Sequence, residues 1–474
     1  MTPDRMTSVV RKWMKGTVAK PPDARTSARQ VMARMPHVRQ RGRWWPLPTF
    51  DRTPKPTTTD QTDDYQPMST PATNGHAPTA SGRTRSMFSP TKAITAGALV
   101  FALGGFLLIA QPFEQQGGSV PGAATGGPGT FGPAGSLAEA RFAHTATLLS
   151  DGRVLVVGGL DYDQDTLIAP AEVWDPGTAT FGPAGSLAQG RAYATATLLP
   201  DGRVLIVGGG NFGDPDDSFA SAEVWDPATE SFSPAGSLAD GRWFHDATLL
   251  PDGRVLILGG DSGDESFAST EVWDPATESF GAAGSLAEAL DGLTATLLSD
   301  GRVLIVGGSR GDDEDDSDDL TLAQFWDPAT ESSSPAGSLA GAPSGHIAMR
   351  LPGDRVLIVD GYHNSGFPAH VWDPATESFG PARWLDTTIV REVNTATLLP
   401  DGRVLIVGTS GFRMSTEIWD PATESLGPAG SLYDARTRMI HTATLLPDGR
   451  VLIVGGGSGA GLVDVAEVWT PGSA

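Results

Sequence analysis

The sequence predicts an all-β protein built from seven copies of one four-stranded antiparallel unit. A fifteen-residue segment typified by TATLLPDGRVLIVGG (195–209) recurs along the chain, and each copy combines short apolar runs with an Asp-Gly or similar turn signal. The copies begin at Thr145, Thr195, Asp246, Thr294, Ile347, Thr395 and Thr442. Their spacing of 47–53 residues indicates a repeat architecture rather than several unrelated domains.

Each segment of the unit can be assigned to an element in order. TATLL is a strand of small and β-branched residues, and Asp-Gly supplies a two-residue hairpin turn. RVLIV is an apolar run typical of a strand covered on both faces, and Gly-Gly ends it where a side chain would block a close neighbour. After a variable loop, AEVWDP is a third strand stopped by proline, and ATESFGPAGSL adds a turn and a fourth strand.

Four-stranded antiparallel units at this period are the blades of a β-propeller, so we expect a seven-bladed β-propeller over residues 130–474. One tryptophan per unit is expected to pack between blades. These are Trp174, Trp225, Trp273, Trp326, Trp372, Trp419 and Trp469. The last unit has no fourth strand of its own, whereas TFGPAGSL (130–137) is an extra copy of one. We therefore expect Thr130–Leu137 to pair with the strand around Val468 and close the ring.

The pattern R-x-x-H-TATLLPDGRVLIVGG…AEVWDPATESF resembles the kelch repeat, in the form found in bacterial proteins and in the central propeller domain of galactose oxidases. The resemblance covers nearly three quarters of the chain and implies the propeller fold. It implies less about function, because kelch propellers serve as enzymes, adaptors and carbohydrate binders. The copper-radical site of the oxidases needs a cysteine cross-linked to tyrosine, and this chain contains no cysteine. The oxidase active site is therefore not expected.

The N-terminal part differs sharply in charge from the repeats. Residues 1–92 carry 16 Lys/Arg and 6 Asp/Glu, a net charge of +10, whereas the remaining residues carry 17 and 50, a net charge of −33. Between them, residues 93–111 are apolar enough for one transmembrane helix. The positive-inside rule then predicts a basic, largely disordered cytoplasmic segment (1–92), a Gly/Pro-rich linker (112–129) and a propeller outside the membrane. The alternative is a cleaved secretory signal starting at Met87, which would give a secreted protein.

Strand direction sorts the connections onto two faces of the propeller. We call the side with the Asp-Gly and DPATES turns the turn face, and the side with the loops after Gly-Gly and before each first strand the loop face. Arg153 and its equivalents on the turn face are interpreted as in-blade ion pairs with Asp175 and its equivalents. The loop face varies between units, and variable loops on a repeated scaffold are where binding usually occurs.

The residues just before each first strand are therefore the predicted ligand site. We expect them to line the mouth of the central channel and to bind a carboxylated or polyhydroxylated ligand. They are Arg141, His144, Arg191, Tyr193, Arg242, Trp243, His245, His346, Arg391, Arg438 and His441. The alternative is that the Arg and His side chains bond to loop carbonyls and are structural.

Calcium is the one cofactor that the loops suggest. Asp161, Asp163, Asp165 and Glu172 stand at positions 1, 3, 5 and 12 of a calcium-loop pattern, although Thr166 replaces the glycine that such a loop needs. A solvated acidic surface is the alternative interpretation.

The sequence favours a binding module over an enzyme, because no catalytic set recurs between the repeats. We expect a membrane-anchored, extracytoplasmic propeller that binds a protein or a carbohydrate. An enzyme that uses the Arg/His mouth on sugar-acid or glycan substrates, and a structural cell-surface spacer, are the alternatives. The acidic charge of the repeats argues against nucleic acid as a partner.

Overall fold

The computed structural model describes residues 128–472, apart from residues 162–163, 212–216, 264, 310–321, 340–344, 362–366, 382, 386–389, 391, 411–412, 424, 434–437 and 459–460. The predicted segments 1–92 and 93–111, and residues 112–127 of the predicted linker, lie outside the described residues. Within the described part of the chain, no helix has the length and apolar character needed to cross a membrane.

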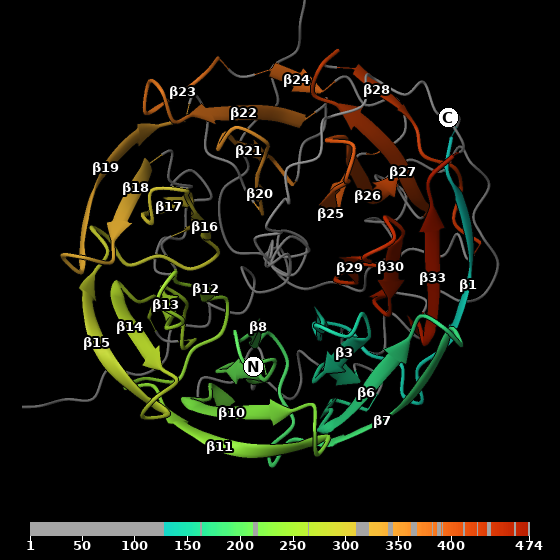
Figure 1. Cartoon of the computed structure of the whole chain (residues 1–474), viewed down its shortest axis with the longest axis horizontal. Helices are drawn as coiled ribbons and strands as arrows, with labels where there is room; N and C mark the ends of the chain where they lie inside the picture. The colour runs from blue at the N-terminus through green and yellow to red at the C-terminus, as the bar shows by residue number, and fades with distance from the viewer. Residues whose placement is uncertain are drawn as a thin grey trace, which may run out of the picture. The chain divides into compact units, whose positions relative to one another are not determined.

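Seven antiparallel sheets stand around a common axis as the blades of a propeller (Figure 1). Blade 1 contains β2 (Thr145–Leu148), β3 (Val154–Val157), β6 (Pro170–Asp175) and β7 (Thr180–Ser186). Blade 2 contains β8 (Thr195–Leu198), β9 (Val204–Val207), β10 (Ser221–Asp226) and β11 (Ser231–Ser237). Blade 3 contains β12 (Asp246–Leu249), β13 (Val255–Leu258), β14 (Ser269–Asp274) and β15 (Ser279–Ser285). Blade 4 contains β16 (Thr294–Leu297), β17 (Val303–Val306), β18 (Leu322–Asp327) and β19 (Ser332–Ser338).

The remaining three blades complete the circle. Blade 5 contains β20 (Ile347–Arg350), β21 (Val356–Val359), β22 (Phe367–Asp373), β23 (Ser378–Phe379) and β24 (Arg383–Leu385). Blade 6 contains β25 (Glu392–Leu398), β26 (Val404–Ser410), β27 (Arg413–Asp420) and β28 (Ser425–Pro428). Blade 7 contains β29 (Thr442–Leu445), β30 (Val451–Val454), β33 (Val465–Thr470) and β1 (Thr130–Ser136). Two short hairpins, β4–β5 (Leu160–Asp161 and Thr166–Leu167) and β31–β32 (Gly457–Ser458 and Gly461–Leu462), extend loops on the loop face.

The first strand of each blade is innermost, and it contacts the first strands of both neighbouring blades. The apolar second strand is buried at every residue because a neighbouring blade covers each of its faces, as the VLVV run of β3 illustrates. Blade 5 is the least regular, because two short strands, β23 and β24, both pair with β22 in the position of the fourth strand. The predicted seven-bladed propeller of four-stranded blades is therefore confirmed.

The N-terminal strand closes the ring as predicted. β1 pairs antiparallel with β33, with Thr130 opposite Thr470, Phe131 opposite Trp469 and Gly132 opposite Val468. The corresponding end of blade 1, where Asp175 lies opposite Thr180, is the β6–β7 turn. The chain therefore enters the propeller on the turn face.

The tryptophans fasten each blade to the one before it. Trp174 is fully buried between blades, and its Nε1–H donates a hydrogen bond of 2.9 Å to the carbonyl oxygen of Ala134 in the fourth strand of blade 7. The same bond, 2.8–3.1 Å long, links Trp225 to Ala184, Trp273 to Ala235, Trp326 to Ala283 and Trp469 to Ala429. The predicted role of these side chains in packing between blades is confirmed, and their polar edge adds a specific bond across the seam.

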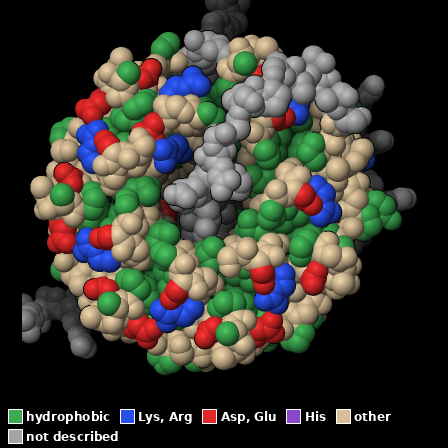
Figure 2. All heavy atoms as spheres, in the orientation of Figure 1, with side chains coloured by type: hydrophobic (Ala, Val, Ile, Leu, Met, Phe, Trp, Pro, Cys, Tyr) green, Lys and Arg blue, Asp and Glu red, His purple; other side chains and the backbone are tan. Residues whose placement is uncertain are grey.

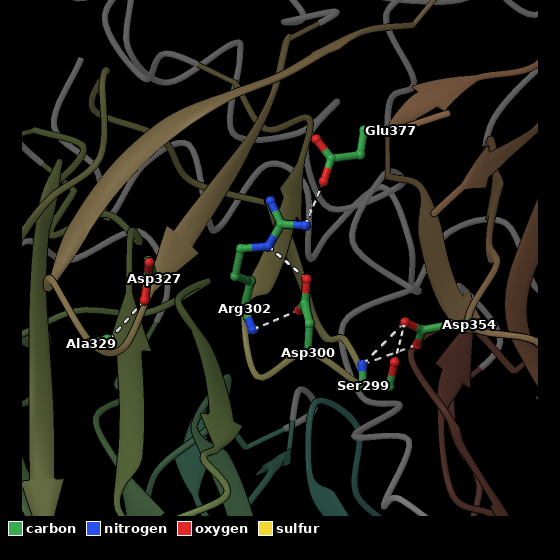
Figure 3. A network of polar contacts seen from close by, with 7 residues as sticks. All are labelled: Ser299, Asp300, Arg302, Asp327, Ala329, Asp354 and Glu377. Carbon is green, nitrogen blue, oxygen red and sulfur yellow. Dashed lines mark hydrogen bonds and ion pairs between the residues drawn. The ribbon is translucent and has the colours of Figure 1, made fainter. Parts of the chain in front are cut away.

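The turn-face arginines have other partners than the sequence suggested. Arg302 Nε donates to Asp300 in its own Asp-Gly turn at 2.7 Å, and Nη2 donates to Glu377 of blade 5 at 2.6 Å (Figure 3). Asp327, the expected in-blade partner, instead accepts the Ala329 N–H at 2.8 Å and so caps its own turn. The same link to the next blade joins Arg153 to Glu230, Arg203 to Glu278 and Arg254 to Glu331. Figure 2 shows basic side chains beside acidic ones around one face of the ring. The predicted pairing of these arginines with Asp175 and its equivalents was wrong, because each of those aspartates accepts N–H groups of its own turn while the arginine pairs with the aspartate of the Asp-Gly turn.

Candidate functional site

A collar of backbone surrounds the loop-face mouth of the channel. The residue two positions before the first strand has a left-handed φ in six blades, including the non-glycine residues Ala143, Tyr193, Phe244 and Ile440 at 54–56°. Neighbouring members are bonded to each other, since the Tyr193 N–H donates to the Ala143 carbonyl at 3.0 Å and the Gly292 N–H to the Phe244 carbonyl at 3.2 Å. A left-handed φ is unfavourable for such residues, so the bonds between blades hold the collar in this conformation.

The arginines that precede the collar are buried inside their blades. Arg141 Nη2 pairs with Glu172 of the third strand at 2.8 Å, while Nη1 donates to the carbonyl oxygens of Gly158 and Pro170 at 3.0 and 2.9 Å. Burial lowers the pKa of Arg141, and the charge of Glu172 opposes this effect. Equivalent pairs are Arg191–Glu223, Arg242–Glu271 and Arg438–Glu467, and all four arginines are at most 1% exposed.

The expected cationic channel mouth therefore needs correction. The four arginines that the structure describes lie within the blades, where each fastens the loop before the first strand to the third strand. Arg391, the fifth predicted arginine, lies outside the described residues. The alternative of a structural role for these side chains fits the four described arginines.

The histidines form a second set of links between blades. His144 Nε2 lies 3.1 Å from Thr442 Oγ1 at the start of the preceding blade's first strand, and His144 is 1% exposed. The same contact joins His245 to Thr195, His346 to Thr294 and His441 to Thr395. The four imidazoles lie along four different seams between blades, so they do not converge on one ligand.

The histidines also explain the first glycine of three Gly-Gly pairs, at Gly208, Gly307 and Gly455. A Cβ added to Gly208 would lie 2.7 Å from the His245 ring, and one added to Gly455 would lie 2.7 Å from the His144 ring. Both glycines have a left-handed φ, so a side chain would be strained there as well as obstructed. The recurring glycine thus makes room for the imidazole of the next blade.

Acid should destabilise the propeller through these histidines. Burial lowers the pKa of His144 and His245 from 6.5 to about 3, and that of His441 to about 4. The unfolded chain takes up protons below pH 6.5 while the folded chain does not, so stability is present above that pH and is lost as pH falls towards 3. We expect His144→Ala, which copies Ala194 of blade 2, to reduce the pH slope of the unfolding free energy between pH 6 and 4 by ~1.4 kcal/mol per pH unit. Urea unfolding across this range measures the slope, and an unchanged slope would contradict a neutral buried His144.

An aromatic cluster lies on the collar over blades 1–3. Tyr193 is partly exposed at the mouth, and its ring meets Phe244 edge-on at 4.8 Å between centroids and Phe142 at 6.4 Å. Trp243 lies behind Phe244, at 6.5 Å between ring centroids, and is only 1% exposed. Of the predicted site residues, Tyr193 thus presents an aromatic ring to the mouth, whereas Trp243 supports the cluster from inside.

Three carboxylates, which sequence reasoning missed, adjoin this cluster on blades 3 and 4. Asp246 starts the first strand of blade 3 and is partly exposed; its carboxylate accepts the Ala295 N–H of blade 4 at 2.7 Å. Asp291 accepts a hydrogen bond from Ser309, and burial together with the nearby charge of Asp261 raises its pKa to about 6. Asp246 stands where five other blades have threonine, and Asp291 falls within a copy that lacks the R-x-x-H pattern. Departure from the repeat was the signal that could have identified them.

A rise in pH from about 4 to 7 should destabilise the propeller through Asp246, opposite to the histidine effect. Burial raises the pKa of Asp246 from 3.8 to about 7, so its contribution to stability is present below pH 3.8 and is lost as pH rises through 7. We therefore compare the unfolding free energy of Asp246→Asn with that of the wild type. The difference should favour the variant more at pH 8 than at pH 5, by on the order of 2 kcal/mol. Unfolding free energies at the two pH values test this, and equal differences at both would refute the raised pKa.

Glu172, the expected twelfth ligand of the predicted calcium loop, has other partners. Glu172 is ion-paired with Arg141 and also accepts the Ala138 N–H at 2.9 Å, so it does not fit the role of twelfth ligand. Asp161 accepts two hydrogen bonds from Gln164, and Asp165 follows in the same turn with a left-handed φ. Asp163 lies outside the described residues. Among the residues that are described, no group of three or more His, Asp or Glu side chains is placed to hold a metal ion.

Comparison with known proteins bears on the fold. Neither a protein-family model nor a curated protein matches the sequence. Many solved chains share the fold, and one is a fungal alcohol oxidase of the AA5 family in complex with copper. It is 18% identical, the match covers 73% of this chain and 77% of that chain, and the TM-score is 0.58. This likeness agrees with the resemblance to kelch and galactose-oxidase-like propellers, and at this identity it shows the fold alone.

Proposed function

We propose that the propeller is a carbohydrate-binding module whose site is the loop-face mouth of the channel over blades 2–4. The observation that carries this proposal is the partly exposed Tyr193, which belongs to an aromatic cluster whose backbone is hydrogen-bonded to the loops that contain Asp261 and Asp291 and leads directly into Asp246. Contacts connect them in sequence: Tyr193 packs on Phe244, and the Phe244 carbonyl accepts the N–H of Gly292, the neighbour of Asp291. Asp261 is close enough to Asp291 for its charge to raise the Asp291 pKa.

This combination suits a polyhydroxylated ligand. The face of an aromatic ring packs against the C–H groups of a sugar, and carboxylates are strong acceptors for its hydroxyl groups. Gly292 and Gly345 hold the collar positions of blades 4 and 5, so no side chain from either position occupies the mouth opposite Tyr193. The four described arginines and Asp291 are buried, whereas Asp246 and Asp261 are partly exposed, so the partly exposed charges described beside the cluster are acidic. A neutral or amine-bearing sugar therefore fits better than the carboxylated ligand that the sequence suggested.

The proposal includes the membrane anchor predicted over residues 93–111. The chain enters the propeller at Thr130, on the turn face. A tether attached there directs the loop face away from the membrane, towards ligands outside the cell. This supports an outward-facing binding module over a structural spacer, because the face with the aromatic and acidic groups is the accessible one.

A glycan screen with the full-length chain tests the proposal. We expect a glycan to bind, and Tyr193→Ala or Asp261→Asn, both at partly exposed residues, to weaken binding at least ~10-fold, about 1.4 kcal/mol. Tyr193→Ala copies Ala143, the equivalent residue of blade 1, so the fold should tolerate it. Tyr433→Ala is the matched control, since Tyr433 is 76% exposed elsewhere and should bind as the wild type does. If no glycan binds, or if the site variants bind as tightly as the wild type, there is no sugar site at the mouth. If a protein binds there instead, the ligand is a protein and not a carbohydrate.

A glycan-directed enzyme is the second candidate. Asp246 and Asp291, with pKa values raised to about 7 and 6, have the near-neutral values of general acids and bases. The buried His144, His245 and His441 are unsuited to this role, because burial lowers their pKa values to about 3, 3 and 4 and so makes them weak bases. Turnover of glycosides or sugar acids that disappears in Asp291→Asn while binding persists would favour the enzyme over the binding module.

A further inference from the structure

Prolines protect the outer edge of most blades. In five blades the fourth strand carries a proline at one fixed register position, opposite a Glu or Gln of the third strand. The pairs are Glu172–Pro183, Glu223–Pro234, Gln324–Pro335, Glu417–Pro428 and Glu467–Pro133. Proline has no N–H, and it is tolerated in a paired strand only where its nitrogen faces away from the ladder. This position therefore faces outward, and the proline prevents another strand from adding to the edge.

Blade 3 lacks this protection. Ala282 takes the place of the proline in β15 and pairs with Glu271 in the same register. Its N–H must face outward, as the proline nitrogen does in the other blades. In an antiparallel ladder the outward-facing residues alternate, so Phe280 also presents its N–H and C=O to the outside. The strand SFGAAGS is uncharged, and Gly281 and Ala282 are exposed.

We propose that β15 pairs antiparallel with β15 of a second copy of this chain, which joins two propellers about a two-fold axis at Gly281. In this register Phe280 lies opposite Ala282 of the second copy, and these residues form four backbone hydrogen bonds. Gly281 lies opposite the second Gly281. A strand that pairs about a two-fold axis must be self-complementary. The side chains of β15 are uncharged, so the pairing brings no like charges together.

A second copy fits this edge better than an unrelated peptide would. Glu278, the charged residue just before β15, is already paired with Arg203 at 2.6 Å and leaves no unpaired charge to select a charged peptide. Gly284 lies against the Glu331 carbonyl of blade 4, where an added Cβ would come within 2.1 Å, so the open edge is the short stretch from Ser279 to Ala283. An interface of this size is small, and the dimer is weak and concentration-dependent. Because both propellers are acidic, added salt strengthens it.

Disulfide trapping tests the register, since the chain has no cysteine of its own. Gly281→Cys places two thiols at a non-hydrogen-bonded pair, with Cα atoms ~4.5 Å apart, within the range for a disulfide. Nothing lies within 4 Å of a Cβ added at Gly281, so the substitution fits. Gly182→Cys is the matched control: Gly182 occupies the same register in β7, also has open space, and lies beside Pro183. We expect oxidised full-length Gly281→Cys to form covalent dimers at least ten times faster than Gly182→Cys.

Ala282 supplies the second test. In the Gly281→Cys background, Ala282→Pro should reduce cross-linking at least tenfold while the thermal midpoint stays within a few degrees, because five blades carry proline in this register. Ala282→Ser keeps the backbone N–H and should cross-link as fast as the Gly281→Cys parent. This variant tests the proposed pairing if the proline variant does not fold. Equal cross-linking by Gly281→Cys and Gly182→Cys, or a folded proline variant that still cross-links, would overturn the proposal. Glycan binding at the mouth is independent of either result.

Discussion

Deletion of residues 130–137 abolishes cooperative folding of the propeller. Without β1, the edge of β33 is open and Trp469 loses its cross-strand neighbour Phe131. The Trp174 Nε1–H loses the Ala134 carbonyl, and the apolar cluster between blades 7 and 1 loses Ala134 and Leu137. The combined loss is comparable with the whole stability of a typical domain, about 5–15 kcal/mol. Thermal unfolding followed by circular dichroism should show no cooperative transition, and the protein should aggregate through its open edge.

Two point substitutions serve as graded controls for this deletion. Ala134→Asp puts a charge at a fully buried position and should lower the unfolding free energy by several kcal/mol. Gly132→Ala lies two residues away on the same strand, where nothing is within 4 Å of an added Cβ, and should have little effect. A deletion variant that melts at the wild-type temperature would show that the closing strand is dispensable.

Arg141→Ala lowers the unfolding free energy by about 3–5 kcal/mol, because it leaves the buried carboxylate of Glu172 without its cation. The carbonyl oxygens of Gly158 and Pro170 lose their donor in the same step. The matched control is Arg153→Ala on the turn face, where both acidic partners are half exposed and the expected loss is about 1 kcal/mol or less. Urea unfolding of the two variants measures the difference. Equal losses would mean that Arg141 is not the buried fastener that the contacts describe.

Most of the fold could be predicted because the repeat states the same pattern seven times. The Asp-Gly turns, the apolar second strands and the surplus strand at Thr130–Leu137 are local signals, and closure follows from counting them. The partners of the arginines could not be predicted, since Arg141 and Glu172 are 31 residues apart and several acidic residues were equally available in the sequence. Only the packing of the loop against the third strand selects Glu172.

The candidate site was harder to predict for the opposite reason. Arg and His residues that recur before the first strands suggest a functional site. Residues that recur from blade to blade, however, are the ones that hold the blades together, so they belong to the scaffold. Asp246 and Asp291 occur at single blades where the pattern changes. The sequence alone does not show that Phe244, which precedes Asp246 by two residues, contacts both the Tyr193 ring and the backbone next to Asp291, because these contacts join three different blades.

Closure of the ring by β1 also determines when the protein can finish folding. β1 is the first strand of the described propeller to be synthesised, and it has to wait for β33, its partner, whose Thr470 is 340 residues after Thr130. At synthesis rates of about 5–20 residues per second, that interval lasts roughly 15–70 s. Six blades can assemble during this time, but the seventh seam stays open until β33 has been synthesised. Chaperones that shield an unpaired strand are therefore expected to act on the nascent propeller at β1.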